Sequence, residues 1–216
     1  MGIIAIRDID NSNSNEQILK LLRQAEGLIK NQFQNMKPSE HPRIKCWRNV
    51  YSTFGAKPSK YNCSIEAMVK RILEGGNVPD INNMVNLYNY ISLKHLISVG
   101  GDDDDKIDGD VTLAIAKGDE KFKEIGQEET KNPNAGEVIF RDDNDVLGRR
   151  WNWRQSQKTK ITKDSKNINL QIEGVYPVAK NDIEEAGNEL MDLIQRFFNA
   201  KPMFYCVDRE NMSVAI

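Results

Sequence analysis

Histidine and cysteine are scarce in this sequence. Its 216 residues contain two histidines, His41 and His95, and three cysteines, Cys46, Cys63 and Cys206. Imidazole-rich metal sites and histidine-based catalytic triads therefore have few residues from which to be built. An odd number of widely spaced cysteines also argues against a disulfide framework and favours a reducing compartment.

Long apolar runs are absent as well. No run approaches the roughly 20 apolar residues that a membrane-spanning helix requires. The four apolar residues 3–6 are too few for the hydrophobic region of a signal peptide. We therefore expect a cytoplasmic protein with no membrane partner. There is also no G-x-S-x-G elbow, no Walker loop and no C-x-x-C pair.

The net charge is close to zero, with 30 basic and 32 acidic residues. This total gives no overall indication of nucleic-acid binding, but the charge is segregated along the chain. Residues 148–163 include six basic residues, no acid and two of the three tryptophans, and residues 41–65 are also free of acids. Cations that alternate with aromatic rings are typical of single-stranded RNA binding. The expected RNA contacts are Arg48, Arg149, Arg150, Trp151, Arg154 and Lys158.

The alternative interpretation of the basic block is structural. Trp151 and Trp153 would then anchor a loop on the core, with solvated cations around them.

The acidic stretch 102–110 also has two interpretations, because six of its nine residues are aspartates. Carboxylates suit a hard divalent cation. The spacing does not fit an EF-hand loop, because Lys106 would occupy one of the ligand positions. The other interpretation is a solvated acidic turn. We expect no metal and no cofactor.

The hydrophobic pattern predicts an α+β domain with mixed sheets and flanking helices. Four helices are expected. The first runs from a Ser14–Gln17 capping box to about residue 34, and the third covers 81–96. The second starts at Ser64, and the fourth starts at Asp182. Short strands are expected over 3–7, 111–116, 137–141, 168–173 and 203–207. We interpret residues 1–40 as an N-terminal strand and helical extension, and residues 41–216 as a single domain.

Several segments together resemble a known family. Ile81–Tyr90, followed by Gly100-Gly101-Asp102 and Lys106–Gly109, is similar to the tRNA-editing (B3/B4) domain of the phenylalanyl-tRNA synthetase beta subunit. Stand-alone bacterial and archaeal relatives of that domain are more similar still. Their features are matched by Arg48 with Tyr51, Phe54-Gly55, Ser64–Ala67, Gly136-Glu137-Val138 and Trp151–Gln155. The resemblance covers about residues 45–200.

The resemblance implies a pocket for the aminoacyl end of a tRNA, since the family's domain hydrolyses tRNA mischarged with tyrosine. The family's Thr-Asn-Tyr stretch falls on Tyr88-Asn89-Tyr90, and its pocket histidine falls on Gly100. Its glutamate, which recognises the phenolic hydroxyl, falls on Gln171 or Glu173, and its Gly-Gly loop is replaced by Trp-Asn-Trp-Arg. The expected catalytic groups are Asn89, Gly100 and Gly101, and the expected pocket residues are Tyr88, Gln171, Glu173 and Trp153.

Three functions follow as hypotheses. The first is a trans-acting aminoacyl-tRNA deacylase, a carboxylic ester hydrolase without an aminoacylation domain, in which backbone N–H groups and Asn89 stabilise the oxyanion. The second is a non-catalytic RNA or tRNA-binding module, because the pocket histidine is missing. The third is a pocket protein for a free amino acid or a related small molecule. The sequence leaves open the amino acid, the tRNA and the oligomeric state.

Overall fold

The computed structural model describes residues 1–216 as five α-helices, two short 3₁₀ helices and eight strands. The α-helices are α1 (Glu16–Gln32), α2 (Pro42–Thr53), α3 (Ser64–Leu73), α4 (Asn83–His95) and α5 (Lys180–Phe198). The 3₁₀ helices are η1 (Pro38–Glu40) and η2 (Asp104–Lys106). The strands are β1 (Gly2–Ile6), β2 (Ser98–Asp103), β3 (Thr112–Ile115), β4 (Val138–Arg141), β5 (Val146–Arg149), β6 (Arg154–Gln155), β7 (Ile168–Glu173) and β8 (Met203–Cys206).

The strands form two four-stranded sheets, in the orders β2-β7-β1-β8 and β3-β4-β5-β6. Every strand pair is antiparallel, so the expectation of mixed sheets is wrong. The helices are segregated from the strands and do not alternate with them as βαβ units do. The predicted α+β class is therefore confirmed.

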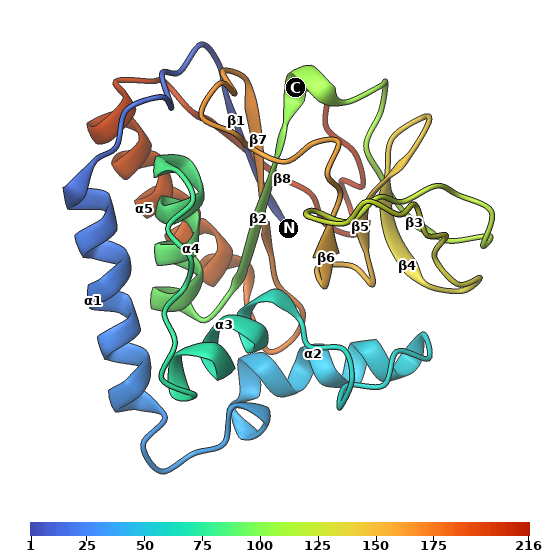
Figure 1. Cartoon of the computed structure of the whole chain (residues 1–216), viewed down its shortest axis with the longest axis horizontal. Coiled ribbons are helices and arrows are strands. Elements are labelled where there is room, and N and C mark those ends of the chain that lie inside the picture. Colours follow the sequence, from blue (N-terminus) through green and yellow to red (C-terminus); the bar gives the residue numbers. More distant parts are fainter.

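The molecule is layered (Figure 1). Helices α1, α4 and α5 lie on one side of the first sheet, and the second sheet lies on the other side. Side chains alternate along β7, so Leu170 and Ile172 are buried in the core with the helices. Gln171 and Glu173, which alternate with them, face the second sheet and line the cavity there. The space between the two sheets is therefore bordered by polar side chains.

Residues 1–40 are integrated into this core. Strand β1 lies between β7 and β8 as an inner strand of the first sheet, and α1 packs along α4. Helix α1 begins one residue later than the capping box at Ser14 suggests, because the Asn15 side chain accepts the hydrogen bond from the Gln17 N–H. The expected extension thus supplies a central strand and part of the helical layer.

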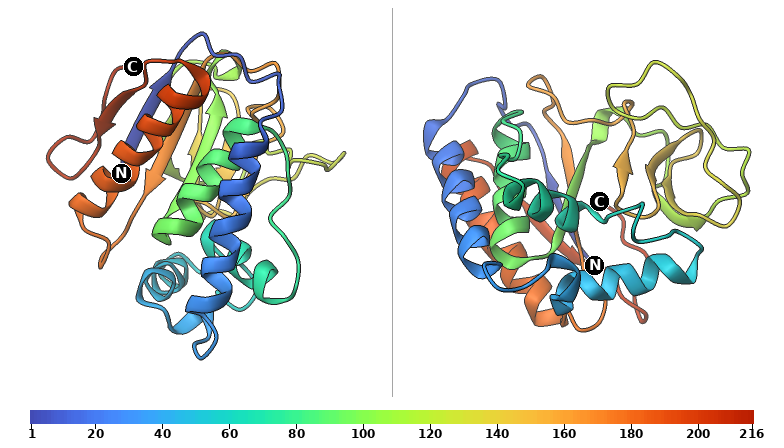
Figure 2. Two further views of the ribbon diagram at one scale, coloured as in Figure 1. Left: turned by 90° about the vertical axis from the view of Figure 1, so that its left-hand side faces the viewer. Right: turned by 60° about the horizontal axis from the view of Figure 1, so that its bottom comes forward.

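Helix α2 is not among the helices expected from the sequence. Pro42 occupies the first turn, where its missing N–H costs no hydrogen bond, and the His41 ring nitrogen accepts from the Arg43 N–H. Figure 2 shows α2 passing below the second sheet. Trp47 of this helix packs against Trp151 in the segment that follows β5. None of the helices combines the length and the apolar composition that crossing a membrane requires.

Candidate functional site

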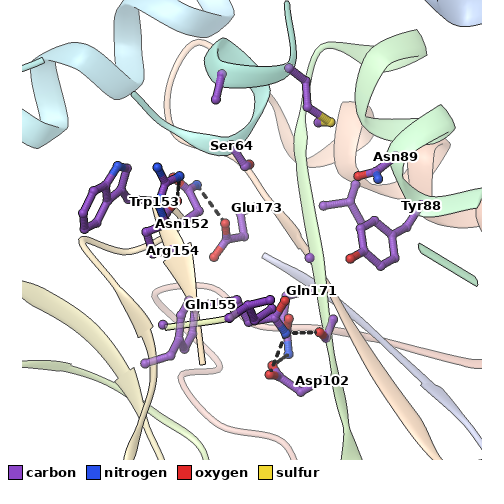
Figure 3. A pocket seen from close by; sticks show the side chains of 18 of the residues that line it. Ser64, Tyr88, Asn89, Asp102, Asn152, Trp153, Arg154, Gln155, Gln171 and Glu173 are labelled. Carbon is purple, nitrogen blue, oxygen red and sulfur yellow. Dashed lines mark hydrogen bonds between the residues drawn. The ribbon is translucent and has the colours of Figure 1, made fainter. Parts of the chain in front are cut away.

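A cavity of about 460 Å³ lies between the two sheets at the free edge of β2. Figure 3 shows Tyr88 and Asn89 projecting from α4 on one side, Asn152 and Trp153 on the other, and Glu173 between them. All seven residues expected to form the catalytic group and the pocket line this cavity: Tyr88, Asn89, Gly100, Gly101, Trp153, Gln171 and Glu173. The structure brings these residues together, and their chemical roles stay predictions.

Glu173 is a buried carboxyl group at the centre of the cavity. The Trp151 ring nitrogen donates to its Oε1 over 3.0 Å, and the Asn152 amide donates to its Oε2 over 2.8 Å. Burial outweighs these two donors and raises the pKa of Glu173 to about 7, from the ordinary value of 4.5. Gln171 lies two residues earlier on the same face, so both candidates for the family's glutamate reach the cavity.

An unusual turn carries Trp151 and Asn152 into the cavity. Arg150 and Trp151 both have left-handed backbone angles, with φ of 47° and 64°, which is rare for large side chains. The ring of Trp151 packs edge-on against Trp47, and the Tyr51 hydroxyl donates to Asn152 Oδ1 over 2.8 Å. Contacts with α2 therefore fix the positions of the two groups that donate to Glu173.

Glu137 holds the start of the same turn. Its carboxylate accepts two hydrogen bonds from the Arg149 guanidinium, over 3.0 and 2.8 Å, and a further one from Arg150. The Arg150 guanidinium also lies 3.9 Å from the centre of the Tyr61 ring and 4.6 Å from that of Trp153. Bidentate pairing of this kind orients a guanidinium strongly. The two arginines therefore act as internal supports.

This arrangement corrects the expected RNA contacts. Arg149 and Arg150 are buried, so neither guanidinium is free to meet a phosphate. Arg48 is paired with the buried Glu66 at 2.6 Å, and Lys158 is enclosed by carboxylates. Trp151 donates to Glu173, which agrees with the alternative interpretation of an anchored loop.

Arg154 is the one expected RNA contact with a substantially exposed cation. Its side chain is 45% exposed, and its guanidinium lies 4.8 Å from the centre of the Trp153 ring. Glu124 Oε1 forms an ion pair with Arg154 Nε at 2.7 Å, and both side chains line the cavity. This ion pair and Trp153 therefore form part of the rim.

Lys158 lies among three carboxylates, and one of them, Asp108, belongs to the acidic stretch for which a divalent cation was considered. Its Nζ lies 2.7 Å from Asp108, 2.6 Å from Asp142 and 3.0 Å from Asp145. One oxygen from each of these carboxylates lies within 4.8 Å of the others, a spacing that suits a metal ion. The ammonium group already lies between the three carboxylates and offsets part of their charge. Asp142 and Asp145 lie outside the acidic stretch 102–110.

Asp102 is the residue whose surroundings the sequence least indicated. It was read as part of a solvated acidic turn or cation site, yet it is 7% exposed and lines the cavity. Thr159 donates to it over 2.5 Å, and Gln155 and Gln171 each donate over 3.1 Å. Burial raises its pKa against the effect of these donors. Strand alternation from Gly100 is the signal that would have placed it on the cavity face.

Three donors of the cavity have no partner within the protein. The Tyr88 hydroxyl and the Asn89 amide make no hydrogen bond with other side chains or with the backbone (Figure 3). Along β2, the N–H groups of Val99 and Asp103 point away from β7, toward Ser92 and Thr159. The alternation of an antiparallel strand directs the Gly101 N–H to that same free edge. The cavity thus presents ready donors to a ligand.

Two antiparallel sheets with a cavity between them, and helices on one outer face, define an α+β domain. Residues 46–199 match the B3/4 domain, and the chain belongs to this family. The confirmed resemblance thus extends over most of the chain.

One solved structure is similar to this chain at a lower level. It is an N-terminal fragment of the phenylalanyl-tRNA synthetase beta subunit from Pyrococcus horikoshii, with 20% sequence identity and a TM-score of 0.46. The match covers 56% of this chain and 41% of that one, so the chain spans less than half of the length of its structural relative. The comparison with curated proteins found no significant match.

Proposed function

We propose that the protein binds the aminoacyl end of a tRNA and hydrolyses the ester of a misacylated aminoacyl-tRNA. The observation that carries the proposal is the convergence of the unpartnered groups of Tyr88, Asn89 and Gly101 with the buried carboxyl of Glu173 in one cavity. Membership of the B3/4 family supports it, as does the name of the structural relative, which is a fragment of a tRNA synthetase.

The charges of the cavity favour an ester over a free amino acid. The charged residues that line it are Asp102, Glu124, Glu173 and Arg154, and Arg154 is already paired with Glu124. A free amino acid brings a carboxylate, which would meet three acids and a single cation in this cavity. An aminoacyl ester has lost that carboxylate and keeps its ammonium group. The third hypothesis, a pocket for free amino acids, is therefore the least favoured.

The proposed reaction needs a positioned water molecule and donors for the developing oxyanion. The water attacks the ester carbonyl carbon, the carbonyl oxygen becomes an oxyanion, and the ribose oxygen leaves with a proton. The Gly101 N–H and the Asn89 amide are the donors that we assign to the oxyanion. Gly100 leaves room beside them, because a Cβ at this position would meet only Gln171 Oε1, at 3.8 Å.

Gly100 also favours the second candidate, a non-catalytic tRNA-binding module. The family's histidine falls at this position, and glycine supplies no side chain for proton transfer. Both candidates share the same rim, where Trp153 offers a ring for base stacking and Arg154 a cation for phosphate. Only turnover separates them.

The deciding experiment measures deacylation of a panel of mischarged tRNAs by the native chain and by Asn89→Ala. Hydrolysis of at least one tRNA, reduced about 100-fold in the variant, supports the deacylase. A chain that binds tRNA but hydrolyses none of the panel is the binding module. Absence of both binding and hydrolysis contradicts the proposal.

A further inference from the structure

Asp102 differs from most other buried acids of the chain in having no cationic partner. Glu26, Glu66, Glu137 and Asp142 are also buried, and each forms an ion pair with lysine or arginine. Asp102 has only the hydroxyl and amide donors of Thr159, Gln155 and Gln171. Neutral donors orient a carboxylate but do not balance its charge in a buried site. The balancing cation is therefore missing from the protein itself.

The open side of this carboxylate faces the cavity. A carboxylate offers about four acceptor positions, and three are used, two on Oδ1 and one on Oδ2. The side chain also lines the cavity, so its remaining acceptor position is accessible to a ligand. Burial raises the pKa of the Tyr88 phenol, and the nearby charge of Asp102 adds to this rise. The unpartnered Tyr88 hydroxyl thus belongs to the same end of the cavity.

The position along β2 fits the geometry of an aminoacyl group. In such a group, one carbon carries both the ammonium nitrogen and the ester carbonyl. Asp102 directly follows Gly101, whose N–H we assign to the carbonyl oxygen, and adjacent Cα atoms lie about 3.8 Å apart. Glu173 is paired with Ser98, four residues from Asp102 along the strand, or about 13 Å. Asp102, next to Gly101, is therefore the carboxyl group that we assign to the ammonium group, and Glu173 is assigned to the acyl side chain.

We propose that Asp102 binds the α-ammonium group of the acyl ligand and makes the site select aminoacyl esters with a free amine. N-acylated aminoacyl esters and hydroxy-acid esters lack this cation and are poor substrates. The inference rests on the proposed function and adds a specificity-determining residue to it. It gives a role to the one buried carboxylate whose open side faces the cavity beside Gly101.

The test compares Asp102→Asn with the native chain on paired substrates. Each pair consists of one aminoacyl-tRNA from the deacylation panel and its N-acetylated form. The matched control is Asp110→Asn, which removes a charge from an exposed position of the same acidic stretch. In the native chain we expect kcat/KM to favour the free amine by about 10- to 100-fold, the range for a hydrogen bond between charged groups. Asp102→Asn should lose this preference, while Asp110→Asn keeps it.

The ratio between the two substrates is an internal control for folding. A variant that loses activity equally on both forms overturns the inference, because Asp102 would then act on the water or on the fold. Unchanged preference in Asp102→Asn overturns it as well.

A binding measurement separates this inference from the proposed hydrolysis. A 3′-aminoacylamino-adenosine is not hydrolysed, and quenching of Trp151 or Trp153, which line the cavity, reports its binding. If the native chain hydrolyses no ester but binds the free amine more tightly than its N-acetyl form, and Asp102→Asn does not, only the hydrolysis is wrong. Equal binding of the two forms contradicts the role of Asp102. Binding of neither form contradicts both proposals.

Discussion

The side-chain amide of Asn152 donates to Oε2 of Glu173 over 2.8 Å, and this hydrogen bond joins the turn after β5 to the first sheet. The orientation of the amide is set from the other side, where its oxygen accepts from Tyr51. The same nitrogen also donates to Ser98 over 3.1 Å. The Asn152 side chain therefore links α2, β2 and β7 around the cavity. The protonation state of Glu173 is coupled through it to all three elements.

The first prediction concerns the pH dependence of stability. Glu173 has a pKa of about 7 in the folded chain and an ordinary value of 4.5. Its contribution to stability is fully present below pH 4.5 and is lost as the pH rises to 7, because the unfolded chain releases the proton first. Glu173→Gln removes this titration. Relative to that of the native chain, the free energy of unfolding of the variant should increase by up to about 3 kcal/mol as the pH rises from 4.5 to 7.5.

Urea unfolding of both proteins across this range measures the effect. Glu210→Gln is the matched control, because Glu210 is exposed. A difference between the native chain and Glu173→Gln that does not change with pH would contradict the assignment of a raised pKa to Glu173.

The second prediction concerns the cluster around Lys158. Partial burial disfavours the ammonium, but hydrogen bonds to Asp108, Asp142 and Asp145 outweigh it and raise the pKa of Lys158. Lys158→Ala leaves the buried Asp142 beside two other carboxylates, so we expect a loss of about 2–4 kcal/mol in the free energy of unfolding. Millimolar Ca²⁺ should restore part of it, because the three oxygens have metal-ligand spacing.

Chemical denaturation with and without Ca²⁺ checks this outcome. Lys163→Ala, at an exposed position without an ion pair, should lose less than about 0.5 kcal/mol and show no response to Ca²⁺. Equal losses in the two variants would show that the cluster contributes no more than an ordinary surface charge.

The third prediction concerns the rim. Arg154→Gln removes the exposed cation beside Trp153, so tRNA affinity should fall about 5- to 10-fold at low salt. The slope of log Kd against log salt should decrease by about 0.7, the value for one single-stranded phosphate contact. Filter binding across salt concentrations measures both.

Arg196→Gln provides the matched loss of charge on α5, in the helical layer away from the cavity. We expect its affinity and salt slope to stay within twofold of the native chain. The same decrease in both variants would indicate a diffuse effect of net charge and would contradict a phosphate contact at Arg154.

Much of the cavity was predictable from the sequence because strand alternation determines it. Gln171 and Glu173 share a face whatever the register of β7, and a resemblance over 81–110 placed Tyr88 and Asn89 beside them. The partners of the cations were not predictable. Glu137 is separated by 12 residues from Arg149 in the chain, and only the hairpin of β4 and β5 brings them together. Composition alone gave no reason to exclude these arginines from the surface.

Strand β2 was missed for a different reason. Its sequence, Ser-Val-Gly-Gly-Asp-Asp, has low intrinsic strand propensity. Pairing with β7 along its whole length and burial between the layers override that preference. Such tertiary effects are not visible in local sequence, and the alternation that places Asp102 on the cavity face applies only once the strand is known.

The last prediction contrasts the two neighbouring glycines of β2. A Cβ at Gly101 would collide with Leu170 and Ile161, whereas one at Gly100 would meet only Gln171 Oε1, at 3.8 Å. Gly101→Ala should therefore lower the free energy of unfolding by about 1–3 kcal/mol.

Gly100→Ala should fold with native stability, because neither glycine has a left-handed backbone that an alanine would strain. Its methyl group nevertheless enters the cavity and should lower deacylation or ligand binding several-fold. Thermal unfolding and turnover measured on both variants separate packing from site geometry. Native activity in a stably folded Gly100→Ala would mean that the ligand does not occupy the space beside Gln171.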